Sequence, residues 1–394
     1  YDGQELNVDV GFIVYNTLNY PNFTAMLDEL GVATIESDMS FSVSDPDGFE
    51  WSSNPSGLFA WKRNALNPGF LGLLAEIIRI NRAGCAAMME DGECDTPLGA
   101  WLDENGFSDS FRESYLLPMG GAIWSTPEGE MLNYPAGALL SFFQNHRLMH
   151  AKRPKWRTID GGSRNYVSAL CQRLGDRVRT GADVRQVRPL PDGSVELDIA
   201  GSASLQFDQV VMANHAPDAH AQLDPAFEDQ RLALGSIRCS ANTAYLHRDA
   251  SLMPRRKSAW ASWNVLKGDD DRVCVTYWMN RLQGIDHDKP LFLTLNPVRP
   301  PRDELVFETF SFDHPMYDLT SAAARRSLQR VQGRDGLYFA GAWLGDGFHE
   351  AGLRSGLEAA YALGGVAPWE AQLKVQHPAP EYRAAAGGVA AARL

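Results

Sequence analysis

The sequence contains little cysteine, and its cysteines are not arranged in pairs. Five cysteines are scattered over 394 residues, at Cys85, Cys94, Cys171, Cys239 and Cys274. An odd number of scattered cysteines without a Cys-x-x-Cys pair excludes a disulfide framework and a cysteine-based zinc site. We therefore expect reduced thiols in a cytoplasmic protein.

Long apolar runs and an excess of positive charge are also lacking. No window of about 18 uninterrupted apolar residues occurs, so no membrane-spanning helix is expected. The 36 Lys and Arg residues are outnumbered by 49 Asp and Glu, and the net charge of −13 argues against a nucleic-acid partner. Zinc-ligand spacing, a Walker loop and a nucleophile elbow are all missing, which leaves hydrolase chemistry without support.

What is present is the composition of a folded protein with room for two domains. Of the residues, 44% are hydrophobic and 22% are charged. These proportions are ordinary for globular proteins, and a chain of this length can bury more than one sizeable core.

The most informative stretch runs from Leu337 to Gly356. A short apolar run at Leu337–Ala340 predicts a buried strand, glycines follow, and an amphipathic helix is predicted to begin near His349. A helix start offers unpaired N–H groups and the positive end of the helix dipole, and glycines let a ligand approach the backbone. The stretch is therefore either a cofactor cradle or a packed strand-to-helix turn.

A second glycine pair strengthens the first interpretation. Gly161 and Gly162 precede a predicted helix in the segment Ile159–Leu170. Downstream we expect strands within Arg177–Val187, at Val195–Ile199 after a Pro-Asp-Gly-Ser turn, and as a buried strand at Phe207–Ala213.

Together with Val8–Tyr15 and Tyr20–Val32, these segments resemble the flavin amine oxidase superfamily, which includes protoporphyrinogen oxidase and the phytoene desaturases. The similarity is greatest to a bacterial branch of NAD/FAD-binding amine-oxidase-like proteins and covers residues 1 to about 365. The superfamily's opening G-x-G-x-x-G motif is not in this sequence, and we expect a fragment whose first strand–helix–strand unit is absent.

The resemblance implies an α/β fold with two interleaved domains. An incomplete Rossmann-like FAD-binding domain would comprise residues 1–35, 150–235 and 330–366. An α+β substrate domain with an antiparallel sheet would comprise residues 36–149 and 236–329, and residues 367–394 would form a C-terminal tail that is frayed from Pro378 to Leu394.

The resemblance also implies which residues would hold FAD. Those beside the isoalloxazine ring would be Gly11, Phe12, Ile13, Gly347, Phe348 and His349. Gly161, Gly162 and Ser163 would lie near the cofactor, Val184 would meet the adenine, and Gly341 and Ala342 would face the pyrophosphate and ribityl chain. The predicted helix start at Gly347–Glu350 would stabilise negative charge on the reduced ring.

Catalytic candidates are few. His349 would serve as a proton relay or simply pack, and Glu350 would offset the dipole of its own helix. In many amine oxidases a lysine bridges through water to the flavin; here Asn242 falls near that position, which favours dehydrogenation of a C–C or C–N bond over rapid oxygen use.

Aromatic residues on a predicted hairpin would either pack a core or line an apolar substrate channel. The hairpin comprises Ser258–Asn264 and Arg272–Asn280, and the substrate candidates are Trp124, Trp263, Tyr277 and Trp278. Trp260 and Tyr134 would lie near them.

Three helices are expected in the substrate domain, at Gly69–Asn81, Pro97–Asn105 and Pro135–Met149, whereas Tyr115–Thr126 is expected to be a loop. The apolar helix Gly69–Asn81 is interpreted as a core helix, with docking on a membrane surface as the alternative.

Two functions remain in view at this point. The first is an FAD-dependent oxidoreductase that takes a hydride from an apolar substrate, such as an acyl chain, a polyene or a hydrophobic amine. The alternative is a truncated or inactive remnant that needs a separate dinucleotide-binding segment to bind FAD.

Overall fold

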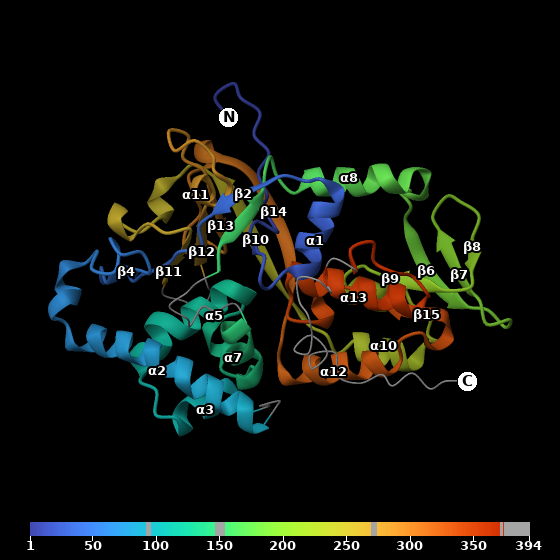
Figure 1. Cartoon of the computed structure of the whole chain (residues 1–394), viewed down its shortest axis with the longest axis horizontal. Helices are drawn as coiled ribbons and strands as arrows, with labels where there is room; N and C mark the ends of the chain where they lie inside the picture. Colours follow the sequence, from blue (N-terminus) through green and yellow to red (C-terminus); the bar gives the residue numbers. More distant parts are fainter. Residues whose placement is uncertain (92–95, 146–153, 269–273, 371–372, 374–394) are drawn as a thin grey trace.

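The computed structural model describes residues 1–91, 96–145, 154–268, 274–370 and 373. Figure 1 shows two halves side by side, one dominated by a large sheet and one by helices and small sheets. We call residues 34–145 and 239–315 the sheet half, and residues 15–30, 156–237 and 319–362 the helix half.

The regular elements alternate along the chain. The strands are β1 (Tyr15–Asn16), β2 (Thr34–Ser37), β3 (Phe41–Ser44), β4 (Glu50–Ser52), β5 (Trp156–Ile159), β6 (Val184–Pro189), β7 (Val195–Ile199), β8 (Leu205–Phe207), β9 (Val210–Met212), β10 (Cys239–His247), β11 (Trp263–Leu266), β12 (Cys274–Trp278), β13 (Phe292–Leu295), β14 (Val306–Pro315) and β15 (Leu337–Phe339). The α-helices are α1 (Pro21–Leu30), α2 (Pro68–Asp91), α3 (Leu98–Glu104), α4 (Asp109–Phe111), α5 (Leu117–Trp124), α6 (Glu128–Met131), α7 (Ala136–Asn145), α8 (Arg164–Leu174), α9 (Ala216–Gln222), α10 (Glu228–Leu234), α11 (Met279–Gln283), α12 (Leu319–Arg330) and α13 (His349–Ala362). A 3₁₀ helix, η1 (Lys62–Leu66), precedes α2, and a π-helical segment, η2 (Arg112–Leu116), precedes α5.

The sheet half is built on a seven-stranded sheet with the order β14-β10-β13-β12-β11-β3-β4. Its pairs are antiparallel except for β11 with β3, where Trp263 lies opposite Phe41 in parallel register. The predicted antiparallel sheet is confirmed, as is the pairing of the two arms of the aromatic hairpin, with Trp263 opposite Tyr277.

Helices α2, α5 and α7 pack together below this sheet (Figure 1) and close the largest hydrophobic core. Along α2 the fully buried side chains Phe70, Leu73 and Ile80 recur at helical spacing, which is why this segment forms an amphipathic helix. Its first residue, Pro68, is accommodated because the first N–H of a helix needs no intrahelical partner.

The helix half is organised around smaller sheets. Strands β9 and β15 form a two-stranded parallel sheet, and β6, β7 and β8 form an antiparallel one. Helices α9, α10 and α12 contribute to one core with these strands, and α1 packs against α13 in another.

Several predicted elements are confirmed, at times with shifted ends. The expected helix at Gly69–Asn81 is the longer α2, Pro97–Asn105 contains α3, and the helix expected from His349 is α13. The expected helix at Pro135–Met149 is α7, whose last four predicted residues lie outside the described part of the chain, as does the tail 374–394.

Three expectations were wrong. Within the expected loop Tyr115–Thr126, residues Tyr115–Trp124 are helical. The first strand expected within Arg177–Val187 begins only at Val184. Strand β9 is not buried throughout, because Val211 is 39% exposed.

Candidate active site

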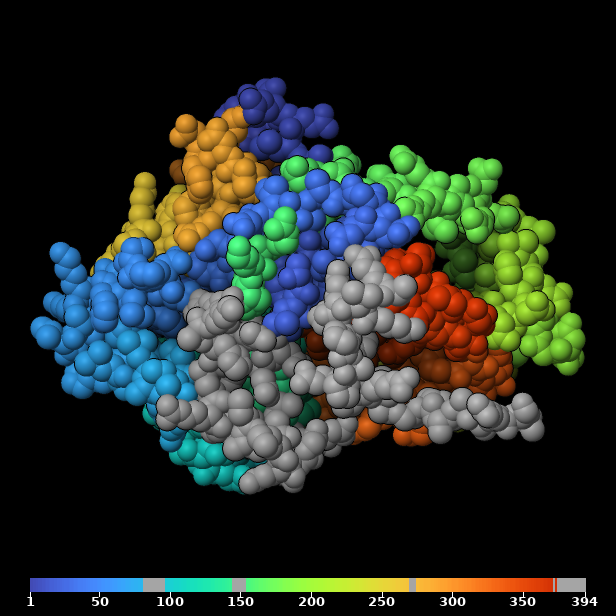
Figure 2. Space-filling view, viewed as in Figure 1, coloured from blue at the N-terminus to red at the C-terminus, as the bar shows by residue number. Residues whose placement is uncertain are grey.

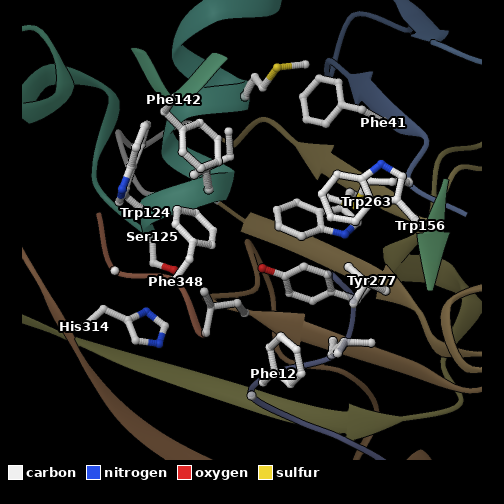
Figure 3. Close-up of a pocket in the computed structure, with 18 of the residues that line it drawn as sticks. Phe12, Phe41, Trp124, Ser125, Phe142, Trp156, Trp263, Tyr277, His314 and Phe348 are labelled. Carbon is white, nitrogen blue, oxygen red and sulfur yellow. The ribbon is translucent and has the colours of Figure 1, made fainter. Parts of the chain in front are cut away.

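A cavity of about 550 Å³ lies where the seven-stranded sheet meets α2, α5, α7 and the start of α13. This volume is in the range that holds a small organic ligand. Figure 3 shows aromatic rings around it, from β3, β11 and β12 on one side and from α5 and α7 on the other. The lining is mainly apolar, and it includes Asp346, Gly347 and Phe348 from the loop before α13 and His349, the first residue of that helix.

The start of α13 opens on this cavity without a side-chain cap. Phe348 occupies the N-cap position and accepts no hydrogen bond from the first turn through its side chain. A helix start without a cap keeps its N–H groups and the positive end of its dipole available to a ligand. The sequence prediction of an open helix start beside a cavity therefore agrees with the geometry.

Gly347 is required at this point for two reasons. Its φ is +90°, a left-handed value that residues with side chains rarely adopt. A Cβ atom at Gly347 would also lie 2.5 Å from the hydroxyl oxygen of Tyr317, which is buried and has no hydrogen-bond partner. An unsatisfied hydroxyl group therefore lies directly against the backbone of this loop.

His349 is packed rather than free. Its ring stacks on Phe12 with centroids 4.0 Å apart, meets Phe23 edge-on, and lies within hydrogen-bond distance of the Tyr166 hydroxyl at 3.1 Å. Burial lowers the pKa of His349 to about 4, so the imidazole is neutral near pH 7. The geometry matches the packing interpretation, and a role in proton relay stays a prediction.

Glu350 lies in the first turn of its own helix, where we expected it, and also reaches a second helix. Its carboxylate accepts hydrogen bonds from the backbone N–H groups of Asn22 and Phe23, both at 3.0 Å, and from the Asn22 amide at 2.7 Å. It therefore caps α1 and leaves the start of α13 open. Burial raises the pKa of Glu350, while these hydrogen bonds act in the opposite direction.

Polar groups on the cavity wall are few, and those of Tyr277, Tyr317 and His314 are neutral at pH 7. The Tyr277 hydroxyl points into the cavity in Figure 3, and burial raises the pKa values of Tyr277 and Tyr317 above the usual range. His314 also lines the cavity, and burial, aided by the nearby His215, lowers its pKa. Asp346, at the exposed rim, contributes the carboxylate among the described lining residues.

Most of the predicted site residues line this one cavity. They are Gly11, Phe12, Ile13, Ala342, Gly347, Phe348 and His349 from the cofactor set, and Trp124, Trp263 and Tyr277 from the substrate set. Residues more than 300 positions apart in the sequence thus meet around one space. What each of them binds stays a prediction.

Other predicted cofactor residues lie elsewhere. Gly161 and Gly162 line a second, polar pocket of about 350 Å³. The Ser163 N–H donates to the Asp9 carboxylate at 2.9 Å, so a carboxylate of the chain itself already occupies the start of α8. Neither Val184 nor Gly341 lines the cavity, and the Trp343 indole packs over Gly341.

Two candidates are not where we expected them. Asn242 lies on β10, is buried away from the cavity lining and hydrogen-bonds Asn296 at 2.7 Å. Trp278 packs against Trp260 and His287 instead of the cavity. Because successive side chains of a strand point to opposite faces, Tyr277 and its neighbour Trp278 cannot share one wall.

Sequence reasoning missed part of the wall. Phe142 stacks on Phe348 at 4.6 Å, and Phe312 and His314 reach the cavity from β14. The alternation Phe310, Phe312, His314 along β14 was the available signal, since residues two apart share a face.

Comparison with known proteins gives the family. Residues 1–241, more than half of the chain, match the family model described as flavin containing amine oxidoreductase. The chain belongs to this family. None of the curated proteins compared with it matches.

Solved structures agree on the fold. The chain is similar to a fatty acid isomerase from P. acnes that produces CLA (TM-score 0.62, 13% identity, 90% of this chain and 86% of that one). It is also similar to cyclohexylamine oxidase from Brevibacterium oxydans (TM-score 0.64, 12% identity, 90% and 87%) and to putrescine oxidase (TM-score 0.59, 14% identity, 90% and 88%). The mixed α/β fold is therefore that of the amine oxidases.

The residues at the cavity fit the ring portion of a flavin. The uncapped start of α13 and the orphaned Tyr317 hydroxyl, which lies against the backbone of Gly347, are at one side of an apolar cavity. Planar aromatic ligands with electron-rich atoms suit such surroundings. Around Gly341, the Trp343 ring lies close to the backbone, and Gly341 does not line the cavity.

Proposed function

We propose that this protein is an FAD-dependent oxidoreductase that takes a hydride from a C–H bond of an apolar substrate, with loss of a proton from the neighbouring atom, so that a C–C or C–N single bond becomes a double bond. The observation that carries the proposal is the open start of α13 at the edge of an apolar cavity, in a member of a flavin-containing family. The fatty acid isomerase and the amine oxidases with the same fold are consistent with apolar substrates of either kind.

The chain's own residues would bind and orient. FAD, when bound, supplies the hydride acceptor, and the protein supplies position and electrostatics. Gly347, Phe348 and His349 would hold the ring, and the N–H groups at the start of α13 would stabilise negative charge on it. Trp124, Trp263 and Tyr277 would exclude water and hold the substrate in the apolar part of the cavity.

A flavin titration tests the proposal directly. The purified chain is mixed with FAD, and bound flavin is measured by its absorption spectrum after gel filtration. We expect binding and, under anaerobic conditions, bleaching by an amine such as cyclohexylamine or by an acyl substrate. A Gly347→Val variant, whose side chain would collide with Tyr317 and displace the loop before α13, should lose flavin, while Gly31→Val should not, since a Cβ at Gly31 meets nothing within 4 Å.

One observation favours the second candidate, a chain that needs a separate dinucleotide-binding segment. The sheet of β9 and β15 has two parallel strands, although parallel sheets are normally larger and covered on both faces. Helix α8 has no fully buried residue along its eleven positions. An added strand–helix unit would cover such surfaces.

The two candidates predict different titrations. If the chain alone retains no FAD but does so after addition of a separately produced strand–helix unit with a G-x-G-x-x-G turn, the second candidate holds. Uptake of FAD by the chain alone rejects it.

A further inference from the structure

The outer surface of η1 and α2 carries exposed apolar side chains that the proposed function does not use. Leu66 is 89% exposed and Ile78 58%, Leu71 is 48% exposed, and Phe59 is 42% exposed. We call these four residues the η1–α2 face. The segment that contains η1 and α2 is coloured in blue shades at the edge of the sheet half in Figure 2.

Helix geometry gathers part of this face into a stripe. Leu71 and Ile78 are seven residues apart and therefore lie on the same side of α2. Gly72 and Ala75, which are also exposed, separate them. Within residues 68–80 the charged side chains are Glu76 and Arg79, and Glu76 is tied to Arg79 and Ser108. A helix side that faces water is normally richer in charge.

The local charge differs in sign from that of the whole chain. The sequence between Trp51 and Ile80 contains three cations, Lys62, Arg63 and Arg79, and one carboxylate, Glu76. The net charge of the whole chain, by comparison, is −13. Lys62 and Arg63 are exposed beside Leu66, and Arg63 lies over the Trp61 ring with its guanidinium carbon 5.8 Å from the ring centroid. Apolar residues with neighbouring cations and an aromatic ring are typical of surfaces that bind a phospholipid interface.

The same helix forms a wall of the cavity. Leu74 and Ile77 line the cavity from one side of α2, and Leu58, next to Phe59, lines it as well. On the helical wheel these positions adjoin the stripe of Leu71 and Ile78, so the apolar surface continues from the cavity wall to the outside.

We infer that the η1–α2 face docks on the surface of a phospholipid bilayer, with its apolar side chains in the acyl region and Lys62 and Arg63 at the head groups. A second copy of the chain fits less well, because a symmetric contact would bring the same cations of both copies together. Delivery of an apolar substrate past α2 into the cavity follows only if the function proposed above also holds. The docking itself does not depend on it.

Vesicle flotation tests the docking with the whole chain. We expect the protein to float with vesicles of phosphatidylcholine and phosphatidylglycerol, and less with phosphatidylcholine alone or at high salt. A Leu66→Ser/Leu71→Ser variant should bind at least about tenfold more weakly, because two apolar side chains lose their burial in lipid. Lys62→Glu/Arg63→Glu should weaken binding to the anionic vesicles selectively.

A matched control separates a defined face from general stickiness. Leu232 on α10 is 76% exposed but belongs to the helix half, so Leu232→Ser should float like the unmodified protein. Thermal unfolding of each variant verifies that the fold is intact, as these side chains are exposed.

Three results would overturn the inference. The unmodified chain does not float, Leu232→Ser loses as much binding as the double variant, or light scattering shows a dimer that the double variant breaks. Flavin uptake, measured on the same samples, reports on the proposed function separately, because neither Leu66 nor Leu71 lines the cavity.

Discussion

One helix from each half, α2 and α8, shows how differently the two regions beside them are packed. In the sheet half, α2 places Phe70, Leu73 and Ile80 at 2% exposure or less, in a core shared with α5, α7 and the large sheet. In the helix half, α8 buries no residue fully, and the sheet of β9 and β15 has only two strands. The cavity walls therefore belong to a well-packed core, whereas the surface of α8 is exposed and available for further contacts.

The largest expected effect comes from a charge inside the sheet half. Glu50 is fully buried, accepts hydrogen bonds from the N–H groups of Arg255 and Arg256 and from Ser44, and pairs with the Arg256 guanidinium at 2.8 Å. Glu50→Ala leaves these donors unpaired and should lower the free energy of unfolding by about 3–5 kcal/mol. Urea denaturation measures the loss. Glu36→Ala, at an exposed pair with Lys155, should cost less than about 0.5 kcal/mol, and equal losses for the two variants would contradict the expectation.

The second effect depends on pH and involves two buried histidines, one in each half of the molecule. Burial lowers the pKa values of His349 and His247 to about 4, below the usual 6.5. The unfolded chain then binds more protons than the folded one between these values, so stability is complete above pH 6.5 and falls as pH drops toward 4. Each histidine should account for a loss of about 2.5 kcal/mol between pH 7.5 and pH 4.5.

Denaturation curves at several pH values of the unmodified chain and of His349→Phe measure this share. The phenyl ring preserves the contacts with Phe12 and Phe23 and cannot be protonated. An unchanged pH slope in His349→Phe would show that the imidazole titrates normally in the folded protein.

The third effect compares two glycines with left-handed backbones. Gly31 ends α1 with φ +67° and open space around it, whereas a methyl group at Gly347 meets the Tyr317 hydroxyl. Gly31→Ala should cost about 1 kcal/mol through the backbone alone, and Gly347→Ala about 2 kcal/mol. Thermal unfolding of both variants gives the difference, which vanishes if the loop before α13 shifts freely.

The smallest effect tests the open surface of the helix half. Val167 on α8 is 46% exposed, so Val167→Ser should change the free energy of unfolding by less than about 0.5 kcal/mol. A loss above about 1 kcal/mol in urea denaturation would mean that α8 is covered in solution. The difference in burial between α2 and α8 would then disappear.

Elements with strong periodicity were predictable from the sequence. The strand at Leu337–Phe339, the helix from His349 and the amphipathic α2 carry their pattern locally. The segment Tyr115–Trp124 does not, because Pro118, Gly120 and Gly121 are usually helix breakers. Pro118 lies in the first turn of α5, and Gly120 allows close packing, since a Cβ there would lie 2.7 Å from the Met131 methyl group.

The site was predictable only in part. The glycines and the helix start predicted a site at Gly347–His349, and the aromatic hairpin predicted Trp263 and Tyr277. The structure brings both to one cavity. The partner of Glu350 was not predictable, because α1 lies more than 300 residues earlier in the chain. Asn242 was misplaced because a position on a strand does not say how far along the sheet the cavity extends.

The carboxylate of Glu350 has a mechanical consequence. From the first turn of α13 it accepts hydrogen bonds from N–H groups in the first turn of α1. Phe12, which precedes α1, stacks on His349, the neighbour of Glu350. Through these contacts α1 and the first turn of α13, which are far apart in the sequence, are held together at the edge of the cavity. A displacement of α1 would therefore be transmitted through these contacts to the first turn of α13 and would change the direction of its N–H groups at the cavity.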